Sequence, residues 1–391
     1  MYSKIIFCIF TLFVIVAFII FCYTKESFQN IQFNQWENRL NELKNVDTKY
    51  KQYFKSLAIN DHSLSFFQPN KIFVSVASYR DNQCSDTIKN IAENADNPEN
   101  LVIVICQQND PKDEDCLVYC NAQNNLPLCK QAKTEIIKLL HTQARGPVWA
   151  RHLVQQKWSG EEFFLQIDSH TRLVKHWDTL LKNQLSLCGP KAILSQYPLE
   201  FDNIDKKDRG DPEKEKWRLD QKRKGLYVKE IGKEGFTRIQ SEYETEQVPR
   251  KPYPATGIAA GFIFAKGQFV KDVPIDPFLY LFFGEQMDIA VRAFTNGYNI
   301  FSPTINIAFH IYDRSHRKTF WELTNQKPLE VLSRFRLYVK LGMISIDKIP
   351  KKYHFILIGI NRYGLGTKRT ISEYEKIAKI NIRDEKMLTD K

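Results

Sequence analysis

Short apolar runs alternate with amphipathic segments along the chain from residue 71 onward. The run Lys71–Tyr79 (KIFVSVASY) is apolar and β-branched, which is typical of a buried strand. Residues 86–94 predict a helix, and Leu101–Gln107 (LVIVICQ) predicts a second buried strand. A strand, a helix and a strand in about forty residues form a βαβ unit, so we predict a parallel sheet that is covered by helices.

The same alternation continues towards the C-terminus. Further strands are predicted at residues 135–140, 163–167 and 192–199, and further helices at 147–158 and 177–184. The pattern therefore predicts the α/β class, with a mostly parallel central sheet flanked by helices. Polar residues gather where several strands end, which is where open α/β sheets bind their ligands.

The domain boundaries follow from changes in this pattern of apolar and polar residues. Residues 71–391 form one predicted domain, with a C-terminal segment at 322–391. Inside it, residues 201–254 are lysine-rich and poor in aliphatic side chains. So long a polar stretch in a compact domain is either a disordered insertion or a functional loop.

The N-terminus predicts a membrane anchor. Residues 5–22 (IIFCIFTLFVIVAFIIFC) are apolar and uncharged, just long enough to span a bilayer, and no small-residue cleavage site follows. We therefore favour an uncleaved signal anchor over a cleaved signal peptide. Residues 1–4 become a cytoplasmic tail and residues 23–70 a stem with some helical spacing, while the body enters the ER or Golgi lumen as in a type II membrane protein.

Composition and net charge limit the classes of protein and of partner that fit this sequence. The 391 residues are 43% hydrophobic and 13% aromatic, which excludes wholesale disorder. The net charge of +11 is compatible with nucleic acid, an anionic membrane or a diphosphate ligand. Because the basic residues are scattered and no base-stacking motif is present, we expect no nucleic-acid partner.

Cysteine usage agrees with an oxidising compartment. Six cysteines lie in the body, and we expect one to three disulfides whose pairing the sequence leaves open. A zinc site is the rival interpretation, but it would need a C-x-x-C pair that the sequence lacks. These cysteines are Cys84, Cys106, Cys116, Cys120, Cys129 and Cys188.

Candidate chemistry centres on Asp168 and His170, which follow the apolar strand at 163–167. On an extended chain residues i and i+2 face the same side, so the carboxylate and the imidazole can converge on one ion. This donor pair suits a divalent ion such as manganese, with magnesium as the alternative. His310, at the end of another apolar run, is the best candidate for a third ligand, although a half-buried histidine without a ligand role is the other interpretation.

A second candidate is the helix start Gly284-Glu285-Gln286-Met287-Asp288. A carboxylate at this position is favourable with the helix dipole even without a ligand. On the functional interpretation, Glu285 or Asp288 is catalytic and contacts ligand hydroxyls. The small residues of the preceding segment 257–262 would allow a ring to lie close to the backbone.

Several ordered motifs carry a resemblance to a known family. They are SVASYRD, QND, GP-x-WAR, GEEFFLQIDSH, AAGFIFAKG, FGEQMDIAVRAFTNGYNIFSP and FHIY. Together they resemble the N-acetylglucosaminyltransferases that modify hydroxyproline on a ubiquitin-ligase adaptor, and more remotely the polypeptide N-acetylgalactosaminyltransferases. The match covers residues 71–321 and resumes at 363–382.

The resemblance implies a GT-A fold and a metal-dependent, retaining transfer of N-acetylglucosamine from UDP-GlcNAc to a protein or glycan hydroxyl. The implied metal ligands are Asp168, His170 and His310. The residues implied near the donor nucleotide are Ser78, Arg80, Asp110, Arg151 and Asp168.

Two departures from the family pattern keep alternatives open. Gln286 stands where the family usually has a second acid, and the hydroxyproline-modifying enzyme is cytoplasmic, whereas this chain has an apparent anchor. The alternatives are a sugar-nucleotide-binding protein without catalysis, a transferase for another UDP-sugar, and a metal-dependent hydrolase. The segment 363–371 predicts either a flap that places Lys368 or Arg369 near phosphate, or a surface turn.

Overall fold

The computed structural model describes residues 35–56, 66–120, 131–200, 224–243, 251–280, 284–315, 317–320 and 327–388. Within these ranges no helix is both long and apolar enough to cross a bilayer. The predicted tail and anchor, residues 1–4 and 5–22, lie outside the described residues.

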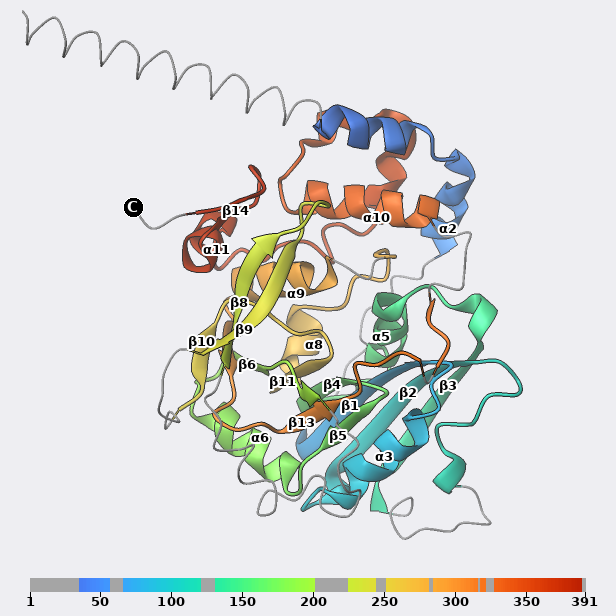
Figure 1. The fold of residues 1–391 in the computed structure, drawn as a ribbon, viewed down its shortest axis with the longest axis vertical. Helices are drawn as coiled ribbons and strands as arrows, with labels where there is room; N and C mark the ends of the chain where they lie inside the picture. Colours follow the sequence, from blue (N-terminus) through green and yellow to red (C-terminus); the bar gives the residue numbers. More distant parts are fainter. Residues whose placement is uncertain are drawn as a thin grey trace, which may run out of the picture.

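An eight-stranded sheet forms the centre of the molecule, in the order β10-β12-β6-β11-β4-β1-β2-β3 (Figure 1). One half is parallel and consists of β3 (Lys133–Leu140), β2 (Leu101–Asn109), β1 (Gln68–Tyr79) and β4 (Glu161–Asp168). The other half consists of β11 (Phe262–Lys266), β6 (Ala192–Ser195), β12 (Asn299–Ser302) and β10 (Tyr253–Ala255). β11 runs antiparallel to β4 and β6, so the sheet is mixed. The predicted α/β class with a large central sheet is confirmed.

Helices cover both faces of this sheet. On one face α3 (Cys84–Glu93) and α6 (Trp177–Ser186) bury Ile88 and Leu181 against the strands. On the other face lie α5 (Pro147–Gln155), α8 (Gln268–Asp272) and α9 (Glu285–Thr295). The alternation of strand side chains explains this layering, since Val74 packs in the first layer and its neighbour Phe73 in the second.

The predicted helices at 86–94, 147–158 and 177–184 correspond to α3, α5 and α6, and the predicted strands up to residue 167 to β1 to β4. The strand predicted at 192–199 is two strands, β6 and β7 (Leu199–Glu200), which belong to different sheets. Residues between them leave the central sheet and approach the cavity described below.

A three-stranded sheet lies beside the central one, in the order β5-β13-β7. It contains β5 (Thr171–Leu173), β13 (Ala308–His310) and β7. β13 pairs antiparallel with β5, and His310 lies opposite Thr171 in that register. This pairing brings His310 next to His170 across 140 residues of chain, because His170 immediately precedes β5.

The polar insertion at 201–254 contains an ordered hairpin, β8 (Lys224–Ile231) and β9 (Thr237–Tyr243). Leu226 and Val228 are buried, and Ile239 packs against the core. The hairpin lies above the central sheet in Figure 1 and joins it to the C-terminal part of the chain. The sequence prediction of a polar excursion missed these strands, because single aliphatic residues alternate there with lysine and glutamate.

The C-terminal part forms an extra layer over α9. It contains α10 (Lys327–Lys340), the 3-10 helix η8 (Lys351–Leu357), α11 (Ile371–Ala378) and the small strands β14 (Ile380–Asn381) and β15 (Lys386–Met387). A helix over residues 35–44 and α2 (Lys51–Ser56), from the predicted stem, pack on this layer. Arg39 forms an ion pair with Glu385, with both side chains only 10% exposed. The helical part of the predicted stem therefore lies on the folded domain.

A disulfide joins Cys84 at the start of α3 to Cys116 in the loop after β2. Cys120 is also disulfide-bonded, whereas Cys106 is a buried free thiol and Cys188 a half-buried one. The prediction of disulfides within the body is confirmed for this region. Cys129 lies outside the described residues.

Candidate functional site

A cavity of about 380 Å³ opens where β1 and β4 end. It is lined by segments from across the chain: the end of β1, the start of α5, the residues after β4, the β9 strand, the loop before β11, the start of α9 and the loop after β13. The carboxyl ends of adjacent parallel strands meet at one edge of a sheet, and the register Ala77 opposite Asp168 places the two strand ends together there.

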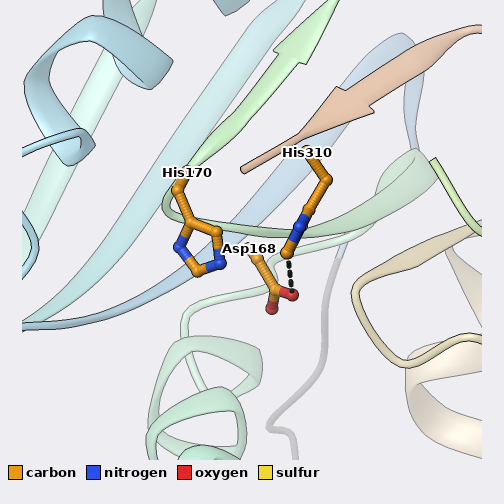
Figure 2. A group of neighbouring side chains, drawn as sticks. All are labelled: Asp168, His170 and His310. Carbon is orange, nitrogen blue, oxygen red and sulfur yellow. Dashed lines mark hydrogen bonds and ion pairs between the residues drawn. The ribbon is translucent and has the colours of Figure 1, made fainter. Parts of the chain in front are cut away.

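Asp168, His170 and His310 all line this cavity, and their side chains point towards one another (Figure 2). One ligand atom from each side chain lies within 4.8 Å of those of the other two. The Asp168 Oδ2 and His310 Nε2 atoms are 3.3 Å apart, and the two imidazole rings have centroids 4.4 Å apart. The structure thus brings together the three residues that the sequence analysis named as metal ligands.

Local chain geometry sets this arrangement. Asp168 is the last residue of β4, and the chain turns at Ser169 before β5 begins. His310 is the last residue of β13, which the β5 pairing aligns with the same turn. The ring of Tyr312 packs against His310, with centroids 4.4 Å apart, and its hydroxyl donates to the carbonyl of Pro198.

Gly261 provides the space for the Asp168 carboxylate. A Cβ atom at position 261 would lie 2.5 Å from Asp168 Oδ2. The loop that carries this glycine is itself fixed, because Gln166 Nε2 donates to the carbonyl of Ala260 at 2.7 Å and the amide of Ala259 donates to Ser195 Oγ. Two strands of the central sheet therefore hold the glycine against the carboxylate.

Arg151 bridges the two acidic side chains of the cavity. Its guanidinium donates to Asp168 Oδ1 and to Glu285 Oε1, at 2.6 Å in both cases. The Arg151 and Glu285 side chains are each 5% exposed. Since Arg151 holds Oδ1 of Asp168 and His310 approaches Oδ2, both oxygens of this carboxylate are constrained.

Burial and neighbouring charges shift the pKa values at the site. Burial alone would raise the pKa of Asp168, but the hydrogen bond with His310 and the positive charge of Arg151 outweigh it and hold that pKa well below its usual range. Burial raises the pKa of Glu285 more than Arg151 lowers it. Burial also lowers the pKa of His170 despite the nearby carboxylate of Asp81, which favours the neutral imidazole that metals require.

Asp81 is a buried carboxylate behind the metal-ligand candidates, and the sequence analysis did not single it out. Its Oδ2 accepts hydrogen bonds from Ser169 Oγ at 2.6 Å and from His170 Nδ1 at 2.7 Å. Asp81 follows the end of β1, as the last residue of the SVASYRD motif. Its place in a polar cluster at a strand end was the one hint in the sequence.

The residues predicted near the nucleotide separate into two groups. Ser78 lines the cavity, and its buried Oγ has no hydrogen-bond partner among the residues that the structure describes. Arg80 and Asp110 are not among the lining residues. Arg80 forms an ion pair with Asp113, whose carboxylate also accepts from the backbone amide of Asp110.

The two predicted catalytic acids also separate. Glu285 lines the cavity, whereas Asp288 points into the core, with its side chain 3% exposed. Asp288 forms ion pairs with Arg292 and with Lys340 of α10, and Lys340 in turn reaches Asp276 at 2.7 Å. Asp288 thus belongs to a buried charge network, and Glu285 is the acid of α9 that can reach a ligand in the cavity.

Several lining residues come from segments for which the sequence analysis named no site residue. They include cationic and aromatic side chains of the loop after β13, of the hairpin and of the residues between β6 and β7: Tyr197, Arg238, Tyr312, Arg314, Arg317 and Phe320. The positions of these residues along the chain do not predict that they meet, so only the folded chain places them at the cavity.

Lys368 and Arg369, which the sequence places either near phosphate or in a surface turn, are not among the described residues that line the cavity. Arg369 donates to the carbonyls of Gly297 and Tyr298, and the amide of Lys368 donates to the carbonyl of Thr295. This segment therefore covers the C-terminal end of α9, whereas the cavity lies at its N-terminal end. The alternative of a surface turn agrees with the exposed side chain of Lys368.

Comparisons with known proteins add the following findings. A family model described as "Glycosyltransferase (GlcNAc)" matches residues 71–127 and 118–384. No curated protein matches the sequence significantly.

Two solved structures share distant similarity. The structure of GalNAc-T7 with UDP, GalNAc and Mn2+ is 11% identical, with a TM-score of 0.49, over 78% of this chain and 56% of that chain. The structure of S. aureus TarS 1–349 in complex with UDP-GlcNAc is 12% identical, with a TM-score of 0.44, over 75% of this chain and 72% of that one. The chain thus spans little more than half of the GalNAc-T7 structure.

Proposed function

Because this chain belongs to the GlcNAc glycosyltransferase family, we propose that it is a metal-dependent, retaining transferase of the GT-A type. It moves N-acetylglucosamine from UDP-GlcNAc to a hydroxyl of a protein or a glycan. The hydroxyproline-modifying enzymes share its motifs, so a protein hydroxyl of that kind is one acceptor within the proposal.

One observation carries the proposal, namely the convergence of Asp168, His170 and His310 in a cavity at the strand ends. The spacing of the three side chains fits a divalent ion. Adjacent ligands of an octahedral ion lie about 3 Å apart, and Asp168 Oδ2 is 3.3 Å from His310 Nε2. One carboxylate and two imidazoles suit manganese, and such a donor set leaves coordination positions for phosphate oxygens.

The charged side chains around the ligands suit a diphosphate. When bound, the metal would supply Lewis-acid stabilisation of the negative charge that develops on the departing UDP. Arg151, beside Asp168, fixes the orientation of that carboxylate, and Arg317 adds positive charge on the cavity wall. Glycines and alanines at 259–261 allow a sugar ring to approach the backbone.

The acidic side chains of the cavity determine which path a transfer with retention of the anomeric configuration can take. Among the described lining residues, Asp168 and Glu285 are the acidic ones. Asp168 is assigned to the metal, and Glu285 is held by Arg151 with its pKa raised. Neither is therefore available as a nucleophile, which favours a front-face path in which the leaving phosphate accepts the proton of the acceptor. Glu285 then orients hydroxyls of the sugar or the acceptor.

The proposal is tested by incubating the purified protein with a panel of UDP-sugars and Mn2+ and measuring UDP release. UDP-GlcNAc should be consumed fastest, and Asp168→Ala and His170→Ala should each reduce release at least about 100-fold. Asp178→Asn is the matched control, since Asp178 is a buried carboxylate that caps a loop away from the cavity. Full activity in the Asp168 variant would refute metal-dependent transfer, and binding of UDP-GlcNAc without turnover would favour the non-catalytic alternative.

The compartment is a further part of the proposal. The apolar residues 5–22 support a type II anchor, and the Cys84–Cys116 disulfide supports a luminal body. Placing a protease-sensitive tag at each end of the full chain and treating intact microsomes with protease tests this topology. Cleavage of the C-terminal tag in sealed vesicles would contradict it.

A further inference from the structure

We propose that Asp81 is a positioning residue for the metal site, because its carboxylate holds the His170 imidazole with Nε2 turned towards Asp168 and His310. This inference rests on the metal dependence proposed above. It concerns a residue that is not among those lining the cavity.

The contacts of Asp81 point to this role. Its side chain is fully buried, and His170 Nδ1 lies 2.7 Å from its Oδ2. A carboxylate can only accept hydrogen bonds, so this contact places the ring proton on Nδ1 and leaves the Nε2 lone pair for a ligand. In Figure 2 one ring nitrogen of His170 faces the Asp168 carboxylate and the other points away from it.

The surroundings of Asp81 fix the carboxylate itself. Its Oδ1 accepts from the backbone amide of Gln83 at 3.0 Å, and its Oδ2 also accepts from Ser169 Oγ. Because Ser169 lies between Asp168 and His170 in the turn after β4, Asp81 holds both the His170 ring and the turn that carries it. Arg317 Nε, 3.6 Å from Oδ2, places a positive charge beside the carboxylate.

The backbone before Asp81 supports the same conclusion. Arg80 has a φ of 48°, in the left-handed region, which is unfavourable for a residue other than glycine. This turn directs the chain from the end of β1 towards the residue after β4. If the Asp81 carboxylate only capped the start of α3, through the amide of Gln83, it would not have to lie next to the His170 imidazole.

The experiment measures Mn2+ affinity of the metal-free protein by electron paramagnetic resonance, so that it does not depend on turnover. Asp81→Ala and the isosteric Asp81→Asn should each weaken binding about 10- to 100-fold, as the loss of an outer-shell partner does in other metal sites. Asp178→Asn, which alters another fully buried carboxylate, should bind Mn2+ like the wild type. If the alanine variant does not fold, the asparagine variant gives the result.

Two further variants, His170→Ala and Asp168→Ala, distinguish a failure of the positioning role from a failure of the metal site. If His170→Ala loses affinity but both Asp81 variants bind Mn2+ as the wild type does, the positioning role is overturned and the metal site stands. If Asp168→Ala and His170→Ala also bind normally, the proposed metal site itself fails.

A second readout needs no metal. Nitrogen-15 NMR of the labelled histidines should show His170 with its proton on Nδ1 in the wild type. This preference should be lost in Asp81→Ala. A proton on Nε2 in the metal-free wild type would overturn the proposal.

Discussion

The packing of Gly261 against Asp168 predicts that one added methyl group will disturb the site without dismantling the fold. In Gly261→Ala the new Cβ would start 2.5 Å from Asp168 Oδ2, whereas ordinary contact begins at 3.4 Å. The carboxylate or the loop must therefore move by roughly 1 Å. Misplacing a catalytic group by that distance costs about 100-fold in rate.

The expected cost in stability is smaller than the functional loss. Overpacking of this kind destabilises by about 1–3 kcal/mol. Because the loop is fixed through Ala260 and Gln166, the Asp168 side chain is the part that can yield. We therefore expect a folded variant with weaker Mn2+ binding and about 100-fold slower UDP release from UDP-GlcNAc.

The assay pairs this variant with Gly225→Ala, in which the added Cβ meets the Tyr227 ring at 2.6 Å, away from the cavity. Thermal unfolding, Mn2+ titration and UDP release are measured for both. Wild-type affinity and rate in Gly261→Ala would refute the reasoning, and so would an equal loss of rate in the Gly225 control.

Three other outcomes can be checked. Arg151→Met leaves the buried carboxylate of Glu285 and the half-buried one of Asp168 without their shared cation. It should lower the free energy of unfolding by about 3–5 kcal/mol in urea titration, and an unchanged value would contradict the bridge. Burial would raise the pKa of Asp276, but the positive charges of Arg336 and Lys340 outweigh it and lower that pKa. The ionised Asp276 carboxylate therefore stabilises the fold above about pH 4, and this stabilisation is lost progressively as the pH falls below about 4. Asp276→Asn should flatten this dependence of stability on pH. Mn2+ at one hundred times its Kd should add about 2.7 kcal/mol to stability in the wild type, and none in Asp168→Ala.

Much of the fold follows from local patterns. The runs before Tyr79, Gln107 and Asp168 are rich in β-branched or aromatic apolar residues, and their strands and the intervening helices lie within a few residues of the predicted ranges. The β8–β9 hairpin was not, since its buried positions are single residues such as Leu226 and Val228 among charged ones. Such a strand becomes recognisable only through the partner that it packs against.

In the candidate site, too, local sequence patterns do not reveal contacts between residues that are far apart along the chain. Asp168 and His170 share one strand end, and this local spacing was enough to pair them. Asp81 meets His170 only because β1 and β4 are neighbours, which no spacing along the chain reveals. Glu285 and Asp288 lie one turn apart on α9, yet one reaches the cavity and the other the core. The difference depends on Lys340, which lies on a separate helix.

The buried charge network beneath α9 also constrains the order in which the chain can complete its fold. Asp276 and Asp288 are buried in the core, and their cationic partners Arg336 and Lys340 come from α10. A nascent chain that ends before α10 would have to bury Asp276 without a cationic partner, and Asp288 with Arg292 as its one partner, which is unfavourable. We therefore expect the layer around α9, and with it the cavity wall that carries Glu285, to reach its final packing only after α10 has left the ribosome.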